Sequence, residues 1–161
     1  MNKKLIIIIA LLSLITVLDG CASKSTKAGQ QLARIEVYSG VDNTLINTIE
    51  DKEGLLEFNQ KTACEEQWDD DYMDQQEKIQ EKLEGHKPLY IFTSYKKPVA
   101  MNNDGTLEKI SEITVYKDTN IIKTQVSPDA VKNFTVPSEY LTYYFDSSDE
   151  TIDFLVSLTN G

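Results

Sequence analysis

Cysteine and histidine are the scarcest of the chemically versatile residues in this sequence. The 161 residues include two cysteines, Cys21 and Cys64, and one histidine, His86. A zinc site needs three or four thiolate or imidazole ligands, and the chain offers too few. A serine or cysteine triad would have to use His86, and no G-x-S-x-G elbow is present. Cys64 precedes Glu65 and Glu66, whose charge disfavours a reactive thiolate, so a small core residue is predicted there.

Positively charged residues are also few. The 16 Lys and Arg residues stand against 26 Asp and Glu, which gives a formal net charge of −10. Nucleic-acid binding neutralises phosphates with clustered Lys and Arg, so this composition argues against a nucleic-acid partner. It also disfavours adsorption of the folded surface to anionic lipid. A basic protein would be attracted, although many solvated domains are equally acidic.

Glycine and regularly spaced acids do not form a recognisable site. The seven glycines are scattered, so no glycine-rich phosphate loop is present. Acids are densest at 69–71, with Asp74 close behind, but their spacing does not follow an EF-hand loop. A solvated acidic face is the favoured interpretation. Carboxylate pairs of the kind that cleave glycosides occur by chance among so many acids, so their presence does not indicate an enzyme. We therefore expect no catalytic, cofactor-binding or metal-binding residue, and a protein that is not an enzyme.

Only one long hydrophobic run occurs, from Leu5 to Leu18. Fourteen residues of helix rise about 21 Å, which is short of the ~30 Å hydrocarbon layer of a bilayer. Lys3 and Lys4 precede the run, and small residues follow it. This order is typical of a signal peptide rather than a membrane span.

The end of the run, Leu18-Asp19-Gly20-Cys21, resembles the lipobox of bacterial lipoproteins. That pattern has an aliphatic residue, a small residue before the cleavage site and an obligate cysteine after it. The resemblance implies a diacylglyceryl thioether on the Cys21 sulfur and cleavage before Cys21. Asp19 departs from the pattern, because this position is usually small and uncharged. The alternative is that Cys21 is an ordinary thiol near an uncleaved N-terminal anchor. Both interpretations place the rest of the chain outside the cytoplasm, tethered to the membrane.

The anchor divides the chain into three predicted parts. Residues 1–20 are a lipoprotein signal peptide, 21–32 a flexible tether of small and polar residues, and 33–161 a single α+β extracytoplasmic domain. With Cys21 lipidated, no intramolecular disulfide is available, so the fold depends on its apolar core. The whole chain resembles small lipoproteins of low-GC Gram-positive bacteria. That resemblance implies a place on the extracellular face of the cell membrane rather than an activity.

The N-terminal half of the domain predicts a hairpin followed by two helices. Strands are expected at Ala33–Ser39, with Ile35 and Val37 on one face against Arg34, Glu36 and Tyr38, and at Leu45–Glu50. Asp51 caps a helix that runs to about Cys64, with an apolar stripe of Leu55, Leu56 and Phe58. A second helix at Tyr72–Glu84 ends at Gly85. Its narrow apolar stripe predicts that it lies loosely on the domain or projects from it.

The C-terminal half predicts mostly strands. They are expected at Leu89–Tyr95, Ile110–Tyr116, Asn120–Val126 and Tyr140–Phe145. Residues 102–105 predict a hairpin turn, because Asp-Gly tolerates positive φ angles. Ser127-Pro128 opens a short helix through Phe134, and Ser148 or Asp149 caps a last helix that docks on the sheet.

These elements indicate the α+β class: one antiparallel sheet built from hairpins, with two to four helices packed on it. The segment that begins at Ile35 can be aligned with the segment that begins at Ile113, because each predicts a strand, an Asn-containing turn, a strand and a capped helix. A duplicated ββα unit and chance similarity stay open as explanations.

Aromatic residues in the candidate strands are the remaining functional lead. They are Tyr90, Phe92, Tyr95, Tyr140, Tyr143, Tyr144 and Phe145. Strand alternation places half of them outside the core, where Tyr makes good contacts, and ordinary sheet packing is the alternative. We expect a non-enzymatic binding module at the membrane, whose ligand the sequence does not name.

Two other functional classes stay open. The first is an immunity or inhibitor protein that neutralises a secreted basic toxin or hydrolase, steered by the acidic segment 65–84. The second is a cell-envelope hydrolase, which a buried acid pair lining a cleft would support.

Overall fold

The computed structural model describes residues 32–63, 72–98, 105–131 and 137–160. Cys21, Cys64, residues 69–71 and most of the predicted turn at 102–105 lie outside these ranges. The described residues belong to one unit that begins with Leu32, the last residue of the predicted tether. Within them, no helix is both long enough and apolar enough to span a bilayer.

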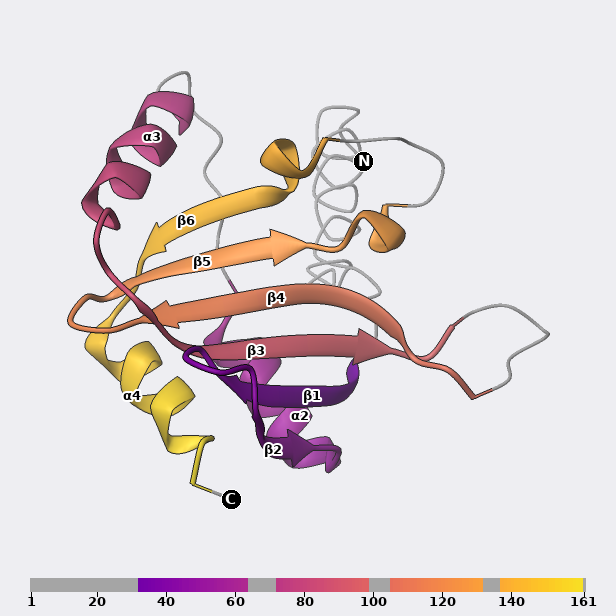
Figure 1. Ribbon diagram of the computed structural model, residues 1–161. Helices are drawn as coiled ribbons and strands as arrows, with labels where there is room; N and C mark the ends of the chain where they lie inside the picture. The colour runs from indigo at the N-terminus through magenta and orange to yellow at the C-terminus, as the bar shows by residue number, and fades with distance from the viewer. Residues whose placement is uncertain (1–31, 64–71, 99–104, 132–136, 161) are drawn as a thin grey trace, which may run out of the picture. The chain divides into compact units, whose positions relative to one another are not determined.

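Six strands form one antiparallel sheet in the order β2-β1-β3-β4-β5-β6 (Figure 1). Their bounds are β1 (Leu32–Ser39), β2 (Leu45–Ile49), β3 (Pro88–Lys96), β4 (Glu108–Tyr116), β5 (Ile121–Val126) and β6 (Thr142–Asp146). Each predicted strand is present, and its ends agree with the prediction to within two residues. The predicted α+β class and the hairpin-built antiparallel sheet are therefore confirmed.

Three α-helices and two short 3₁₀ helices accompany the sheet. They are α2 (Lys52–Lys61), α3 (Tyr72–Lys82), α4 (Asp149–Ser157), η1 (Pro128–Ala130) and η2 (Ser138–Leu141). The Asp51 carboxylate caps α2 by accepting a hydrogen bond from Gly54 N, 2.8 Å away. Ser148, rather than Asp149, caps α4 by accepting from Thr151 N at 3.2 Å. The local capping signals thus predict where both helices begin.

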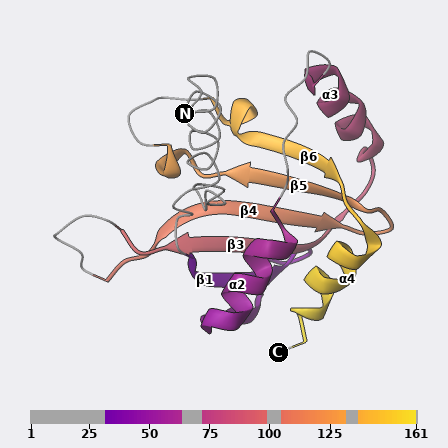
Figure 2. The same ribbon diagram turned by 180° about the vertical axis from the view of Figure 1, so that it is seen from behind.

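The core lies on the sheet face that α2 and α4 cover (Figure 2). Strand alternation directs Ile35 and Val37 to this inner face, and both are fully buried. The buried residues of the core are Ile35, Val37, Ile49, Leu55, Phe58, Phe92, Ile113, Val115, Ile122 and Leu155. One expectation for α2 is wrong: Leu56 does not belong to the buried stripe and is 54% exposed, while Leu55 and Phe58 are buried.

Helix α3 is attached more firmly than its sparse apolar stripe predicts. It lies beside β6 at the edge of the sheet, and the Gln76 side chain hydrogen-bonds the β6 backbone at Tyr144 (Figure 1). Leu83, just after the helix, is buried. Gly85 ends this segment with φ +85°, as predicted from the preference of glycine for that conformation.

The two similar segments form hairpins on opposite sides of β3. Because β1 and β4 are both antiparallel to β3, they run parallel to each other with Ile35 and Ile113 on the same inner face. Their partners β2 and β5 lie on opposite outer sides. One hairpin therefore cannot be superimposed on the other with both apolar faces inward. The likeness is confined to the hairpin pattern, since α2 has 10 residues and η1 has three.

Candidate functional site

The candidate site lies on the outer face of the sheet, opposite α2 and α4. Strand register aligns one polar side chain from each of five neighbouring strands across this face. The row is Glu36, Thr93, Glu112, Gln125 and Thr142. Such a row has no role in core packing, because its members alternate with the buried inner residues of the same strands.

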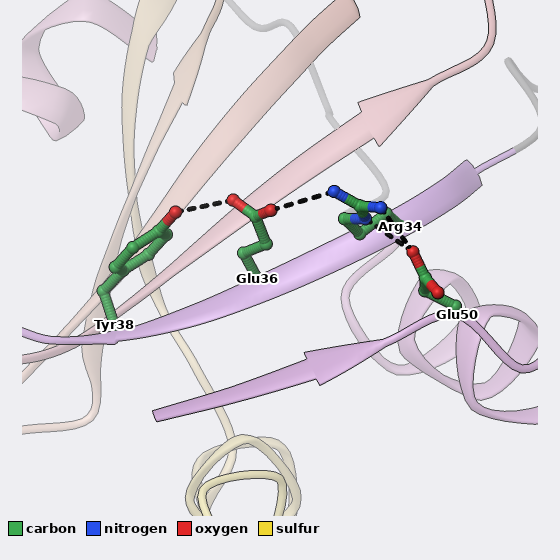
Figure 3. A network of polar contacts seen from close by, with 4 residues as sticks. All are labelled: Arg34, Glu36, Tyr38 and Glu50. Carbon is green, nitrogen blue, oxygen red and sulfur yellow. Dashed lines mark hydrogen bonds and ion pairs between the residues drawn. The ribbon is translucent and has the colours of Figure 1, made fainter. Parts of the chain in front are cut away.

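Glu36 is the centre of a hydrogen-bonded network on β1. Figure 3 shows its carboxylate between Tyr38 and Arg34, all three rising from the same face of the strand. The Tyr38 hydroxyl donates to Glu36 Oε2 at 2.6 Å, and Arg34 Nη1 donates to Glu36 Oε1 at 3.3 Å. Arg34 also pairs with Glu50 through Nε, 2.7 Å from Glu50 Oε1. The Glu36 side chain is only 16% exposed, so the network holds an almost buried carboxylate in a defined position.

The charge on Glu36 is stabilised by these donors. Burial is the largest single effect and by itself raises the pKa of Glu36. Hydrogen bonds from Tyr38, Tyr95 and Arg34 outweigh burial, so the pKa of Glu36 lies below its ordinary value. Burial, followed by the hydrogen bond to Glu36, raises the pKa of Tyr95. The hydrogen bond to Glu36, followed by burial, raises the pKa of Tyr38. The carboxylate is therefore ionised and both phenols are protonated at neutral pH.

A second carboxylate, Glu112, lies across β3 from Glu36. Lys109 Nζ is 2.8 Å from Glu112 Oε1, and the Thr93 hydroxyl approaches the same oxygen at 3.4 Å. Lys109 reaches this face because a register shift between β3 and β4 pairs it with Tyr95. Each of the two carboxylates therefore has its own cation.

A shallow hollow of about 290 Å³ opens between these groups. It is lined by Tyr38, Asn43, Ile91, Thr93, Tyr95, Lys109 and Glu112. The lining combines two tyrosines, an apolar patch at Ile91 and several hydrogen-bonding groups. This composition suits a ligand that is held by contact area and directed hydrogen bonds.

The geometry suits binding better than acid–base chemistry. A general acid needs a raised pKa, whereas the pKa of Glu36 is lowered by the groups that hold it. Glu112 is compensated by Lys109. Within the described ranges, no three His, Cys, Asp or Glu side chains are grouped so that they could hold a metal ion.

The residues considered from the sequence lie largely elsewhere. Cys21, the predicted lipidation site, and Cys64 are outside the described ranges. His86 lies in the loop between α3 and β3, where its Nδ1 is 2.8 Å from the Lys117 carbonyl oxygen and donates to it. Asp74 is exposed on α3.

Among the predicted aromatic residues, Tyr95 alone lines the hollow. Phe92 is fully buried in the core, whereas Tyr140 is 60% exposed. The sequence did place Arg34, Glu36 and Tyr38 on one face, but it carried no signal that Glu112 and Lys109 join them.

No protein-family model matches the sequence, and no curated protein or solved structure resembles it at a significant level.

Proposed function

We propose that this chain is a non-enzymatic binding module, held on the extracellular face of the cell membrane by a lipid on Cys21, and that its ligand binds the outer face of the sheet. The observation that carries the binding site is the Glu36 network. A carboxylate that is 16% exposed and held by hydrogen bonds from Tyr38 and Arg34 is a pre-organised acceptor rather than a solvated charge.

The hollow beside this network supports the proposal. Tyr38 and Tyr95 contribute to both, so a ligand in the hollow would meet side chains whose positions are already set. Pre-organisation of this kind reduces the conformational entropy lost on binding. The internal pairing of Arg34 with Glu36 and of Lys109 with Glu112 favours a ligand without high net charge, because a charged ligand would have to compete with existing ion pairs.

The binding site can be tested by photo-crosslinking on intact cells. A photoreactive amino acid replaces Lys123, which extends from the outer face of β5, or Glu57, which is exposed on α2. We expect a discrete crosslinked product from position 123 and none from position 57. The yield of this product should fall when the Glu36→Gln substitution is combined with the photoreactive residue at position 123. Crosslinking of equal strength at both positions, or only at position 57, would contradict the assignment.

The anchor is tested separately by metabolic labelling with palmitate. We expect the Cys21→Ser variant to lose the label, because the acyl chains are carried by that sulfur. The matched control is Cys64→Ser, which should keep it. Unchanged labelling of Cys21→Ser would remove the proposed anchor and the membrane location with it.

The immunity or inhibitor function remains the alternative, motivated by the net charge of −10. The described part of segment 65–84 is residues 72–84, most of which form α3, and there exposed acids are interspersed with Lys78 and Lys82. If the product crosslinked at position 123 is a basic secreted protein released by moderate salt, this alternative gains support.

A further inference from the structure

The two edges of the sheet differ. At the β6 edge, Gln76 of α3 occupies both backbone groups of Tyr144. The opposite edge is β2, beyond which no described segment pairs. Proteins usually protect such an edge with a covering element, proline or charge, because unpaired strand groups recruit other strands.

Strand β2 is short, and its pairing with β1 shifts register between Val37 and Tyr38; both features limit strand addition. It lacks the stronger protections of a described covering element, proline or charge. Its five residues, Leu45–Ile49, include no proline and no charge. Val41 in the preceding turn is 86% exposed, Leu45 is 54% exposed and Ile46 is 39% exposed. The outermost strand and the turn before it therefore expose three large apolar side chains.

The backbone of β2 is held ready for pairing. The Asn47 side chain donates to the Leu158 carbonyl oxygen at 2.8 Å, which fastens the strand to the end of α4. Asn47 also accepts from Thr48 N at 2.8 Å, so the Thr48 amide faces away from β1. Because antiparallel ladders alternate, the Thr48 carbonyl faces outward too. An incoming strand would exchange the local Asn47 bond for a ladder bond.

The charges around β2 indicate the chemistry of a partner. Between 42 and 53 the chain has four acids, Asp42, Glu50, Asp51 and Glu53, and one lysine. Glu50 is already paired with Arg34, so it contributes little to attracting a basic partner. Asp42 and Asp51 lie beyond the two ends of the strand. A second copy paired antiparallel through β2 would bring Asp42 of one chain near Asp51 of the other at both ends. An extended segment with basic ends would meet complementary charge instead.

We propose that β2 is a strand-addition site for an extended segment of another protein, with apolar residues in its centre and basic residues at its ends. Main-chain hydrogen bonds to β2 would supply the pairing, and Val41, Leu45 and Ile46 would supply apolar contact. This surface is the edge of β2, which adjoins the outer face proposed above, since Thr48 pairs with Glu36 across the two strands. The proposal does not require a ligand on the outer face.

A synthetic peptide tests the proposal. The probe is a fluorescent peptide of alternating valine and threonine with two lysines at each end, titrated with the full chain in a neutral detergent. We expect saturable binding by fluorescence anisotropy, which is lost when alternate central amides are N-methylated. The same peptide with glutamates at its ends should bind at least about tenfold more weakly, a difference of about 1.4 kcal/mol.

Two protein variants form a matched pair, because Leu45 and Leu56 are both 54% exposed. Leu45→Lys should weaken binding about tenfold. Leu56→Lys, which adds the same charge on α2, should leave binding within about twofold.

Three outcomes would overturn the proposal. Equal binding of the N-methylated peptide would exclude strand pairing. An equal loss of peptide affinity in Leu45→Lys and Leu56→Lys would mean that the added positive charge, rather than its position on β2, weakens binding. A dimer in analytical ultracentrifugation that dissociates in Leu45→Lys would show that a second copy, rather than another protein, occupies the edge.

Discussion

Gln76 of α3 takes the place of a neighbouring strand beside Tyr144 of β6. Its amide nitrogen donates to the Tyr144 carbonyl oxygen at 2.9 Å, and its amide oxygen accepts from the Tyr144 N–H at 2.7 Å. One side chain thus satisfies both outward groups of an edge residue and fastens a polar helix to the sheet. A helix with a narrow apolar stripe can dock in this way because hydrogen bonds replace part of the missing apolar contact.

The first prediction follows from these two hydrogen bonds. Gln76→Ala should lower the free energy of unfolding by about 1–3 kcal/mol, since each bond contributes about 0.5–1.5 kcal/mol. Urea unfolding measures the change. The control is Gln75→Ala, an exposed neighbour on the same helix, which should shift the free energy by less than about 0.5 kcal/mol. Equal effects in the two variants would contradict the bridging role of Gln76.

The second prediction compares adjacent leucines on α2. Leu55 is 9% exposed and Leu56 is 54% exposed. Leu55→Ala should cost about 2–4 kcal/mol, because it removes transfer free energy and leaves a cavity beneath the sheet. Leu56→Ala should change stability by less than about 0.5 kcal/mol. Thermal and urea unfolding of both variants check the orientation of α2, and a reversed order would mean that the helix presents its other face.

The third prediction concerns the pH dependence of the Glu36 network. The folded-state pKa of Glu36 is lowered, so its contribution to stability is present above the unfolded-state pKa and is lost as pH falls through the folded-state pKa. Wild type should therefore exceed Glu36→Gln in unfolding free energy at neutral pH. The difference should shrink as the pH falls below the ordinary carboxyl value of 4.5. Urea titrations between pH 3 and pH 8 measure it, and a difference independent of pH would argue against an ionised, hydrogen-bonded Glu36.

The fourth prediction concerns the close approach of Gly40 to Pro88. A Cβ placed on Gly40 would lie 2.5 Å from the Pro88 carbonyl carbon, and the Gly40 N–H already donates to the Leu89 carbonyl oxygen at 2.9 Å. Gly40→Ala should therefore destabilise the fold by about 1–3 kcal/mol, because the obstructing atoms are backbone atoms. The neighbouring Val41→Ala, at a residue 86% exposed, serves as the control and should have little effect. Similar stability of the two variants would show that β1 and β3 can separate there without loss.

The strands, the helix caps and the fold class were predictable because their signals are local. Asp51 and Ser148 cap helices through hydrogen bonds that span three residues, and alternation in β1 requires no knowledge of its neighbours. The error at Leu56 has a physical cause. Two adjacent leucines can both fit an apolar stripe, and only the position of the sheet decides which of them is covered.

The candidate site was predictable only in part, because it joins strands that are distant in the sequence. Arg34, Glu36 and Tyr38 share a face of β1 by alternation alone. Thr93 and Glu112 become their neighbours through the pairing of β1 with β3 and of β3 with β4. Lys109 joins them through a register shift, which no pattern in the sequence of β4 indicated.

By itself, the sequence determined which side chains of β1 share a face and where α2 and α4 begin, because covalent geometry and short-range hydrogen bonds set both. Tertiary structure decided the strand order, the register and the docking of α3. Those choices depend on the burial of whole faces and on hydrogen bonds between distant segments, such as Gln76 with Tyr144. They gave Glu36 its neighbours across the sheet, and they left β2 as the open edge.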